Sequence, residues 1–300
     1  PRIRTILARM VELRDPLAEP AARQTRLQTV DGIALALEEF GNVPGADIVY
    51  AHGFGQTRQA WLSCARATAR AGWTSTTYDA RGHGQSSWLE SGDYSVDQLV
   101  DDLRQVCASR SQAPVVVGAS MGGLVGIALA GQALDACRAL ILVDITPRWE
   151  AAGVERILAF MRAHPEGFSS LDEAAEVIAG YLPHRAQRKS PERLGSLLIP
   201  DADGRLRWHW DPRMLESIAH DGVSHQADLM QAATRIRVPT MLISGSESDV
   251  VSESTIAEFL HLVPHARHAV VEQATHMVAG DENTRFAGLV QRFLDELPSD

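Results

Sequence analysis

The chain has little cysteine, no excess of positive charge and no long hydrophobic run that is free of breakers. Its three cysteines, Cys64, Cys107 and Cys137, are odd in number and widely spaced along 300 residues. This argues against a disulfide framework and against a zinc site, and we expect a reducing, cytoplasmic setting. The formal net charge of -10 argues against nucleic acid or an anionic membrane as the main partner, because neither attracts a surface of that sign.

The longest uncharged stretch, residues 113–131, approaches the length of a membrane span. It contains Pro114 and five glycines, so it predicts a buried strand followed by a helix, and no stable insertion into a membrane. The sequence also lacks a Gly-x-Gly-x-x-Gly fingerprint and a phosphate-binding lysine loop, so nucleotide cofactors are not implied. Three histidines, His261, His265 and His268, are separated by Pro264 and have no acidic or cysteine neighbour at ligand spacing. We therefore expect no cofactor and no metal.

What the sequence does contain is an alternation of short apolar runs with helical patterns. With 45% hydrophobic and 22% charged residues, it has the composition of a globular protein with a substantial core. Two strand-like runs flank Asp31-Gly32, a strong hairpin signal. The expected strands are 26–30, 33–39, 48–51, 74–78, 115–117, 140–143, 239–245 and 268–271. Such alternation predicts an α/β fold: a mostly parallel sheet of about eight strands with helices on both faces.

Three segments with different patterns divide the chain. Residues 1–25 predict an appended amphipathic helix, which we expect to dock on the domain or to pair with a second copy in a homodimer. Residues 26–147 and 235–300 carry the strand and helix alternation of the core. Residues 148–234 lack a good buried strand and are punctuated by prolines, which predicts an inserted helical cap.

The most informative motif is Gly118-Ala119-Ser120-Met121-Gly122, which directly follows the apolar run at 115–117. A serine between two glycines at a strand-to-helix turn predicts a nucleophile elbow. The sharp turn lifts the hydroxyl clear of the sheet, where a base can activate it. Ser120 is therefore the candidate nucleophile.

The serine needs a base, and the base needs an acid that fixes its tautomer. His276 is the preferred base among the eleven histidines, because it lies in a loop just after the last expected strand. Asp249, which follows the preceding strand, is the preferred acid. Asp144 ends an earlier strand at the same edge of the sheet and is the main rival; we expect it to anchor the junction between sheet and cap instead. Glu247 is a minor alternative.

A tetrahedral oxyanion needs two backbone N–H donors. Met121, directly after the serine, supplies one at the N-terminus of its helix. Phe54, in the glycine-rich loop His52-Gly53-Phe54-Gly55 after an earlier strand, is expected to supply the other.

With these motifs in place the chain resembles the α/β-hydrolase fold family over residues 26–298. In that family a Gly-x-Ser-x-Gly elbow, a His-Gly loop and a late aspartate and histidine recur in the order Ser, Asp, His. The segment from Asp79 to Ser86 is similar to the family's structural turn before the elbow strand, which implies no catalytic role for His83. An aspartate at the elbow would resemble epoxide hydrolases and dehalogenases; Ser120 instead implies acyl or C–C chemistry.

The resemblance implies a serine hydrolase, a carboxylesterase, that acts on a small-molecule ester with a small or medium apolar group. Two enzymatic alternatives remain open. One is a C–C hydrolase of the meta-cleavage-product type, which needs a cation for the substrate's carboxylate and could use Arg148 or Arg207. The other is a cofactor-free perhydrolase or haloperoxidase. A ligand receptor or regulatory protein without turnover is an alternative of another class.

Large apolar residues in the cap are candidates for the substrate pocket. Among them we single out Trp149, Trp208 and Trp210, and above all the stretch Trp208-His209-Trp210. Most such side chains pack cap helices against each other in proteins of this kind, so each assignment competes with a plain packing role.

Overall fold

The computed structural model describes residues 20–181, 194–217, 225–276, 278 and 284–298. Its centre is an eight-stranded sheet with the order β1-β2-β4-β3-β5-β6-β9-β10. The strands are β1 (Ala22–Gln28), β2 (Ala34–Phe40), β3 (Asp47–Ala51), β4 (Thr74–Tyr78), β5 (Val115–Ala119), β6 (Ala139–Val143), β9 (Thr240–Gly245) and β10 (Arg267–Val271). Pairing is antiparallel at β1-β2 and β2-β4 and parallel everywhere else. The prediction of a mostly parallel sheet is confirmed.

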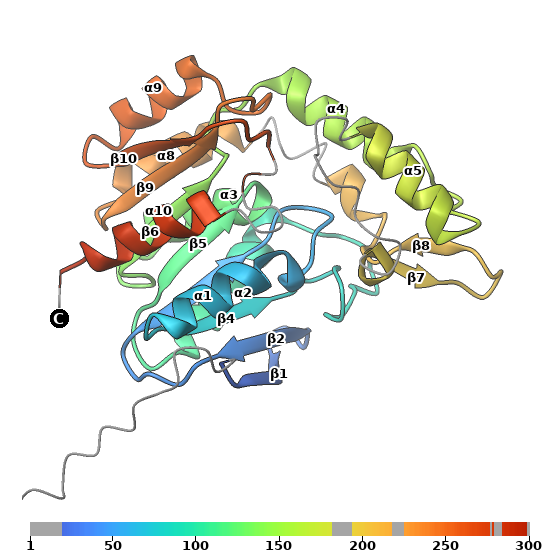
Figure 1. Ribbon diagram of the computed structural model, residues 1–300, viewed down its shortest axis with the longest axis horizontal. Helices are drawn as coiled ribbons and strands as arrows, with labels where there is room; N and C mark the ends of the chain where they lie inside the picture. The colour runs from blue at the N-terminus through green and yellow to red at the C-terminus, as the bar shows by residue number, and fades with distance from the viewer. Residues whose placement is uncertain (1–19, 182–193, 218–224, 277, 279–283, 299–300) are drawn as a thin grey trace, which may run out of the picture.

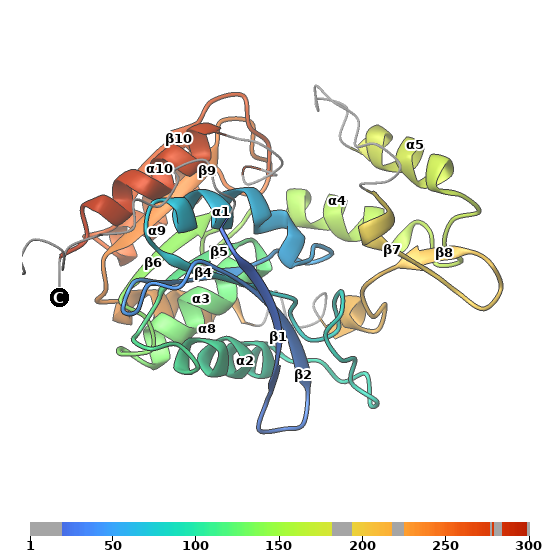
Figure 2. The same cartoon turned by 60° about the horizontal axis from the view of Figure 1, so that its bottom comes forward.

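Two helical layers cover the sheet. The core helices, with the 3-10 turn η1, are η1 (Arg58–Trp61), α1 (Leu62–Arg70), α2 (Val96–Ala108), α3 (Met121–Gln132), α8 (Gln226–Arg235), α9 (Glu253–Leu262) and α10 (Thr284–Asp295). One hydrophobic cluster joins the sheet to α2, α3, α8 and α9, and the other joins it to α1 and α10. Figure 2 shows α2, α3 and α8 on one side of the sheet and α10 on the other.

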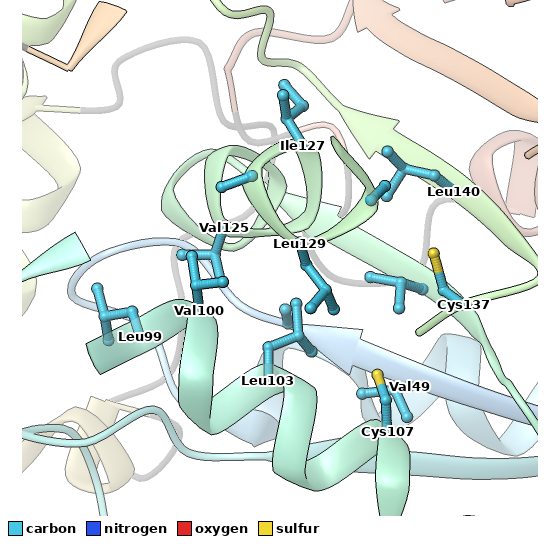
Figure 3. Packing of buried hydrophobic residues seen from close by; sticks show 14 of the residues in the cluster. Val49, Leu99, Val100, Leu103, Cys107, Val125, Ile127, Leu129, Cys137 and Leu140 are labelled. Carbon is cyan, nitrogen blue, oxygen red and sulfur yellow. The ribbon is translucent and has the colours of Figure 1, made fainter. Parts of the chain in front are cut away.

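The central strands read as continuous apolar runs because both faces are covered. Val115, Val116 and Val117 are all completely buried. Figure 3 shows Leu103 of α2 beside Leu129 of α3, and Val49 of β3 beside Cys107 of α2, all in one buried cluster. Each large apolar side chain buried in this way stabilises the fold by roughly 1.5–3 kcal/mol. The three cysteines are buried and free.

The cap consists of α4 (Ala151–Arg162), α5 (Leu171–Tyr181), the short η2 (Gly195–Leu197) and a hairpin of β7 (Leu198–Pro200) and β8 (Leu206–Trp208). Figure 1 shows α4, α5 and this hairpin together beside the sheet. The hairpin is absent from the sequence prediction, although Asp203-Gly204 at its turn is a hairpin signal and Gly204 has a φ of +80°.

One boundary differs from the prediction. Helix α8, which the sequence assigned to the cap up to residue 234, packs on α3 in the core layer. A Cβ at Gly131 of α3 would lie 2.3 Å from the carbonyl oxygen of Ala232, so the two helices touch backbone to backbone. The apolar face of α8 therefore completes the core.

The appended segment expected over residues 1–25 lies outside the described residues up to position 19. Strand β1 covers Ala22–Gln28, so the prediction of a helix is wrong for residues 22–25. Among the described helices, none combines the length and the apolar character that a membrane span requires.

Candidate functional site

Ser120 lies between the end of β5 and the start of α3, in a strained backbone conformation. Its φ is +47° and its ψ is -118°, a backbone conformation that residues other than glycine rarely adopt. The Ser120 amide donates to the Val143 carbonyl oxygen at 3.2 Å, and its own carbonyl oxygen accepts from the first turn of α3. This is the geometry of a nucleophile elbow.

The glycines of the motif are required by close backbone approaches. A Cβ at Gly118 would lie 2.4 Å from the Gly122 carbonyl oxygen, and a Cβ at Gly122 would lie 2.3 Å from that of Ala51. Only glycine permits such distances, so the motif allows α3 to pack directly on the sheet.

His276 reaches the same edge of the sheet from the loop after β10. Its Nδ1 lies 2.8 Å from Oδ2 of Asp144. The chain before His276 crosses β9, where a Cβ at Gly245 would lie 2.3 Å from the Ala274 carbonyl oxygen. That crossing brings the imidazole over the end of β6.

Asp144 is completely buried and holds several donors besides the histidine. Its Oδ1 accepts from the Gly245 amide at 2.8 Å, and its Oδ2 accepts from the Ser248 hydroxyl at 2.6 Å. Asp144 follows β6, the neighbour of β5, and Val143 is the register partner of Ala119. Ser120 and Asp144 are thus the residues that directly follow the ends of two adjacent strands.

The expectation that Asp249 would contact His276 is wrong. The Asp249 carboxylate forms an ion pair with Arg156 of α4 and retains 28% of its side-chain exposure. A Cβ at Gly153, in the first turn of α4, would lie 2.1 Å from the Asp249 carbonyl oxygen. The two expected roles are therefore exchanged: Asp249 joins core and cap, and Asp144 holds the histidine. Glu247 is exposed.

The loop after β3 lies directly against the serine. A Cβ at Gly53 would be 3.2 Å from the Ser120 Cβ. Residues 53–56 form a tight turn in which the Gln56 amide donates to the Gly53 carbonyl oxygen at 3.1 Å, and Gly55 has a φ of +73°. Phe54 is the second residue of this turn, and Met121 is the first residue of α3. Both candidate oxyanion donors therefore belong to segments that adjoin Ser120.

Three buried histidines surround this turn. His52 and His83 have ring centroids 5.1 Å apart, and His83 and His209 have centroids 6.1 Å apart. Burial lowers the pKa of His52, lowers the pKa of His83 well below its ordinary value, and lowers that of His209 to about 4. All three rings are neutral at pH 7. In the sequence His209 stands out only as a polar side chain of the cap beside Trp210.

Only one of the three candidate pocket tryptophans approaches the serine through this loop. Trp210 has its ring 5.0 Å from that of Phe54. Trp149 packs on a cluster of Ile145, Val250 and Val251. Trp208 packs within the cap, 5.1 Å from the Phe168 ring. Their assignment to a substrate pocket stays a prediction, and the contacts favour Trp210.

Helix α4 crosses above the carboxyl edge of the sheet. Gly153 of α4 contacts the loop after β9, and Met161 of α4 contacts the loop after β3. A Cβ placed at Gly55 in that loop would lie 2.6 Å from the Met161 Cε. The two contacts are about 12 Å apart along the helix, and β9 and β3 are about 14 Å apart across the sheet. Between β9 and β3 lie β6 and β5, so α4 passes over the ends that carry Asp144 and Ser120.

The two arginines considered for a substrate carboxylate are engaged elsewhere. Arg148 pairs with Glu258 and is half exposed. Arg207 pairs with Asp201 and Asp203 on the cap hairpin. Within the described ranges, no group of three or more His, Cys, Asp or Glu side chains is arranged to hold a metal ion.

Comparisons with known proteins identify the family and the fold. A family model described as the alpha/beta hydrolase fold matches residues 48–282. A 3-hydroxybutyrate-oligomer hydrolase from Cupriavidus necator is 28% identical, with 81% of this chain and 86% of the relative covered. An esterase from Mycobacterium tuberculosis is 28% identical, with 88% and 87% covered. The solved structure of E-2-(acetamidomethylene)succinate hydrolase superposes with a TM-score of 0.80 over 92% of this chain and 100% of that chain, at 23% identity, which supports the fold alone.

Proposed function

Because the chain belongs to the α/β-hydrolase fold family and is a hydrolase, we propose that it cleaves carboxylic esters through a Ser120-His276-Asp144 triad. The observation that carries this proposal is the 2.8 Å contact between His276 Nδ1 and the buried Asp144 carboxylate, one strand away from a serine in elbow geometry. The esterase function of the mycobacterial relative supports the same reaction class.

In the proposed mechanism His276 takes the proton of the Ser120 hydroxyl as the oxygen attacks the ester carbonyl. The amides of Phe54 and Met121 stabilise the negative charge on the tetrahedral oxygen. His276 then protonates the departing alcohol, which leaves an acyl group on Ser120. A water that His276 deprotonates attacks this acyl-enzyme, and the acid is released.

Asp144 has the orienting role in this mechanism. An acceptor on Nδ1 keeps the Nδ1 proton in place, so that Nε2 is the basic nitrogen that faces the serine. The carboxylate also stabilises the imidazolium that forms in each half-reaction. Its own hydrogen bonds to Gly245 and Ser248 hold it in one orientation.

The substrate we propose has a small or medium apolar group. Met161 and Trp210 both approach the Gly53–Gln56 turn, and α4 crosses above the serine. These side chains offer apolar surface and no charge. A C–C hydrolase needs a cation for its substrate carboxylate, and both candidates, Arg148 and Arg207, are held in ion pairs with other residues. We therefore favour the ester.

The test is hydrolysis of p-nitrophenyl esters of increasing acyl length by the wild type and by Ser120→Ala. We expect an optimum at short to medium chains and a loss of turnover of roughly 10³-fold or more in the variant. Circular dichroism of the variant provides the control for folding. Activity near the wild-type level in Ser120→Ala would remove Ser120 as nucleophile, and no turnover by the wild type would remove the esterase assignment.

A further inference from the structure

The tight turn at residues 53–56 is held by imidazole rings from three different segments. The Gly53 carbonyl oxygen lies 2.8 Å from His52 Nδ1, and the Gly55 amide donates to His83 Nε2 at 3.2 Å. The Gly55 carbonyl oxygen lies 3.2 Å from His209 Nε2. Both polar backbone groups of Gly55 are therefore bound, and one of the two partners comes from the cap.

The hydrogen-bond roles of His209 follow from its partners. A carbonyl oxygen only accepts, so Nε2 donates to Gly55. The Gly84 amide only donates, so His209 Nδ1 accepts from it at 3.0 Å. One neutral tautomer satisfies both contacts, and the ring has no further nitrogen to offer.

The contact at the Gly53 carbonyl oxygen constrains the direction of the Phe54 amide, and the contacts at Gly55 constrain the turn that follows it. A peptide unit is planar and trans, so the Gly53 carbonyl and the Phe54 N–H lie in one plane and point in opposite directions. The Gly55 amide lies in the peptide unit between Phe54 and Gly55, and the Gly55 carbonyl lies in the unit between Gly55 and Gln56. Gly55 has a positive φ and no side chain to restrict it, so its two hydrogen bonds supply the restraint that the residue itself lacks.

The segment that carries His209 is itself fixed to the core. The Gly84 amide shares its hydrogen between His209 Nδ1 and the His209 carbonyl oxygen, which lies at 3.1 Å, and the Asp211 amide donates to the Gly82 carbonyl oxygen at 2.8 Å. The Tyr94 hydroxyl donates to the Asp211 carboxylate at 2.8 Å. His209 is 3% exposed. A buried ring on an anchored segment is a rigid support for the turn.

We infer that His209 is a positioning residue for the oxyanion donor: through Gly55 it holds the turn in which the Phe54 N–H faces Ser120. This inference rests on the proposed function. It couples the cap to catalysis, because the residue that follows His209 is Trp210, which packs on Phe54. His209 acts through the backbone of the turn and does not touch the substrate.

The variants separate the two contacts of the ring. In His209→Gln the amide nitrogen lies as many bonds from Cα as Nε2 does, so it can replace the donor to Gly55. In His209→Asn the shorter amide can replace Nδ1 as acceptor for Gly84 but leaves the Gly55 carbonyl without its donor. A matched control is His265→Asn, since His265 Nε2 lies 3.0 Å from a backbone carbonyl oxygen, that of Val238, at an exposed position.

Two rates are measured for each variant: kcat and KM with a p-nitrophenyl ester, and the second-order rate at which a fluorophosphonate labels Ser120. Both reactions place charge on an oxygen in the oxyanion site. We expect His209→Asn to lower kcat and the labelling rate together by about tenfold or more, with little change in KM. His209→Gln and His265→Asn should stay within about threefold of the wild type.

The inference fails if His209→Asn, folded by circular dichroism, keeps both rates near the wild-type values while Ser120→Ala is inactive. It also fails if His209→Gln and His209→Asn lose activity equally, because the donor to Gly55 would then not matter. Wild-type activity in Ser120→Ala would instead overturn the proposed function, so the two failures are distinguishable.

Discussion

Two aspartates near one edge of the sheet have different environments, and the difference supports the roles proposed for them. Asp144 is completely buried and accepts hydrogen bonds from a backbone amide, a hydroxyl and an imidazole. Asp249 is partly exposed and pairs with an arginine of the cap. A buried carboxylate with a full set of donors is held in one orientation, whereas a surface ion pair contributes about 0–1 kcal/mol.

Asp144→Asn should lower kcat by about 10³-fold to 10⁴-fold with a small change in KM. The new amide presents N–H groups to partners that are themselves donors, so His276 loses the acceptor that fixes its tautomer. Asp249→Asn is the matched control, and we expect its kcat to stay within about threefold of the wild type. The measurement is steady-state ester hydrolysis. A larger loss of kcat in Asp249→Asn than in Asp144→Asn would show that Asp249 is the acid of the triad.

At the scale of elements, α4 connects two loops at the carboxyl edge of the sheet. The helix is attached at both ends of its crossing, to the loop after β9 through Gly153 and to the turn after β3 through Met161. Its first turn is also anchored, because the Glu150 amide donates to the Val250 carbonyl oxygen at 2.9 Å. These contacts attach α4 to the core at both of these loops.

Met161→Ala should move the acyl-length optimum toward longer esters by about two carbons, since it removes three heavy atoms beside Gly55 and each methylene of new space favours a longer chain by about 0.8 kcal/mol. The measurement is kcat/KM across the p-nitrophenyl ester series. Met230→Ala on α8 makes the same change of side chain outside the cap and should leave the optimum where it is. An unchanged optimum in Met161→Ala would show that α4 does not limit the acyl group.

At the scale of the whole molecule, the buried histidines link stability to pH. Burial lowers the pKa of His209 to about 4 from its ordinary 6.5, so between these values the unfolded chain binds a proton that the folded chain does not. The free energy of unfolding therefore falls as pH falls through this window. Groups that face His209 include His52 and Asp79, which act in opposite directions on its pKa.

His209→Gln removes this titration. Between pH 6.5 and pH 4 the wild type should lose about 3 kcal/mol more free energy of unfolding than the variant. Urea denaturation at half-unit pH intervals measures the difference. Parallel curves for the two proteins would contradict the assignment of a neutral, buried ring to His209.

Much of the fold could be predicted from local patterns. The hairpin at Asp31-Gly32, the alternation of buried strands with helices and the elbow around Ser120 depend on residues close together in the chain, and the structure contains all three. The first strand is the exception in its bounds: the sequence predicts it over 26–30, and β1 covers Ala22–Gln28. The prediction placed α8 in the cap and was wrong. The partner of α8 is α3, which is about a hundred residues away in the chain, and the apolar pattern of α8 alone does not indicate which surface it packs on.

The choice between Asp144 and Asp249 also depends on contacts between distant parts of the chain. Both Asp144 and Asp249 follow strands at the carboxyl edge, so position along the chain does not separate them. The choice depends on where residues 274–276 cross the sheet, which Gly245 permits through its close contact with Ala274. The signal that favours Asp144 is that β6 is the direct neighbour of β5, and this emerges only once the strand order is known.

The role of Ser120 as nucleophile is tested most directly by the site of covalent capture. The protein is treated with a fluorophosphonate and the modified peptide is identified by mass spectrometry, with Ser120→Ala treated in parallel. We expect one adduct, on Ser120, and none in the variant. An adduct on another residue, or equal labelling of Ser120→Ala, would contradict this role.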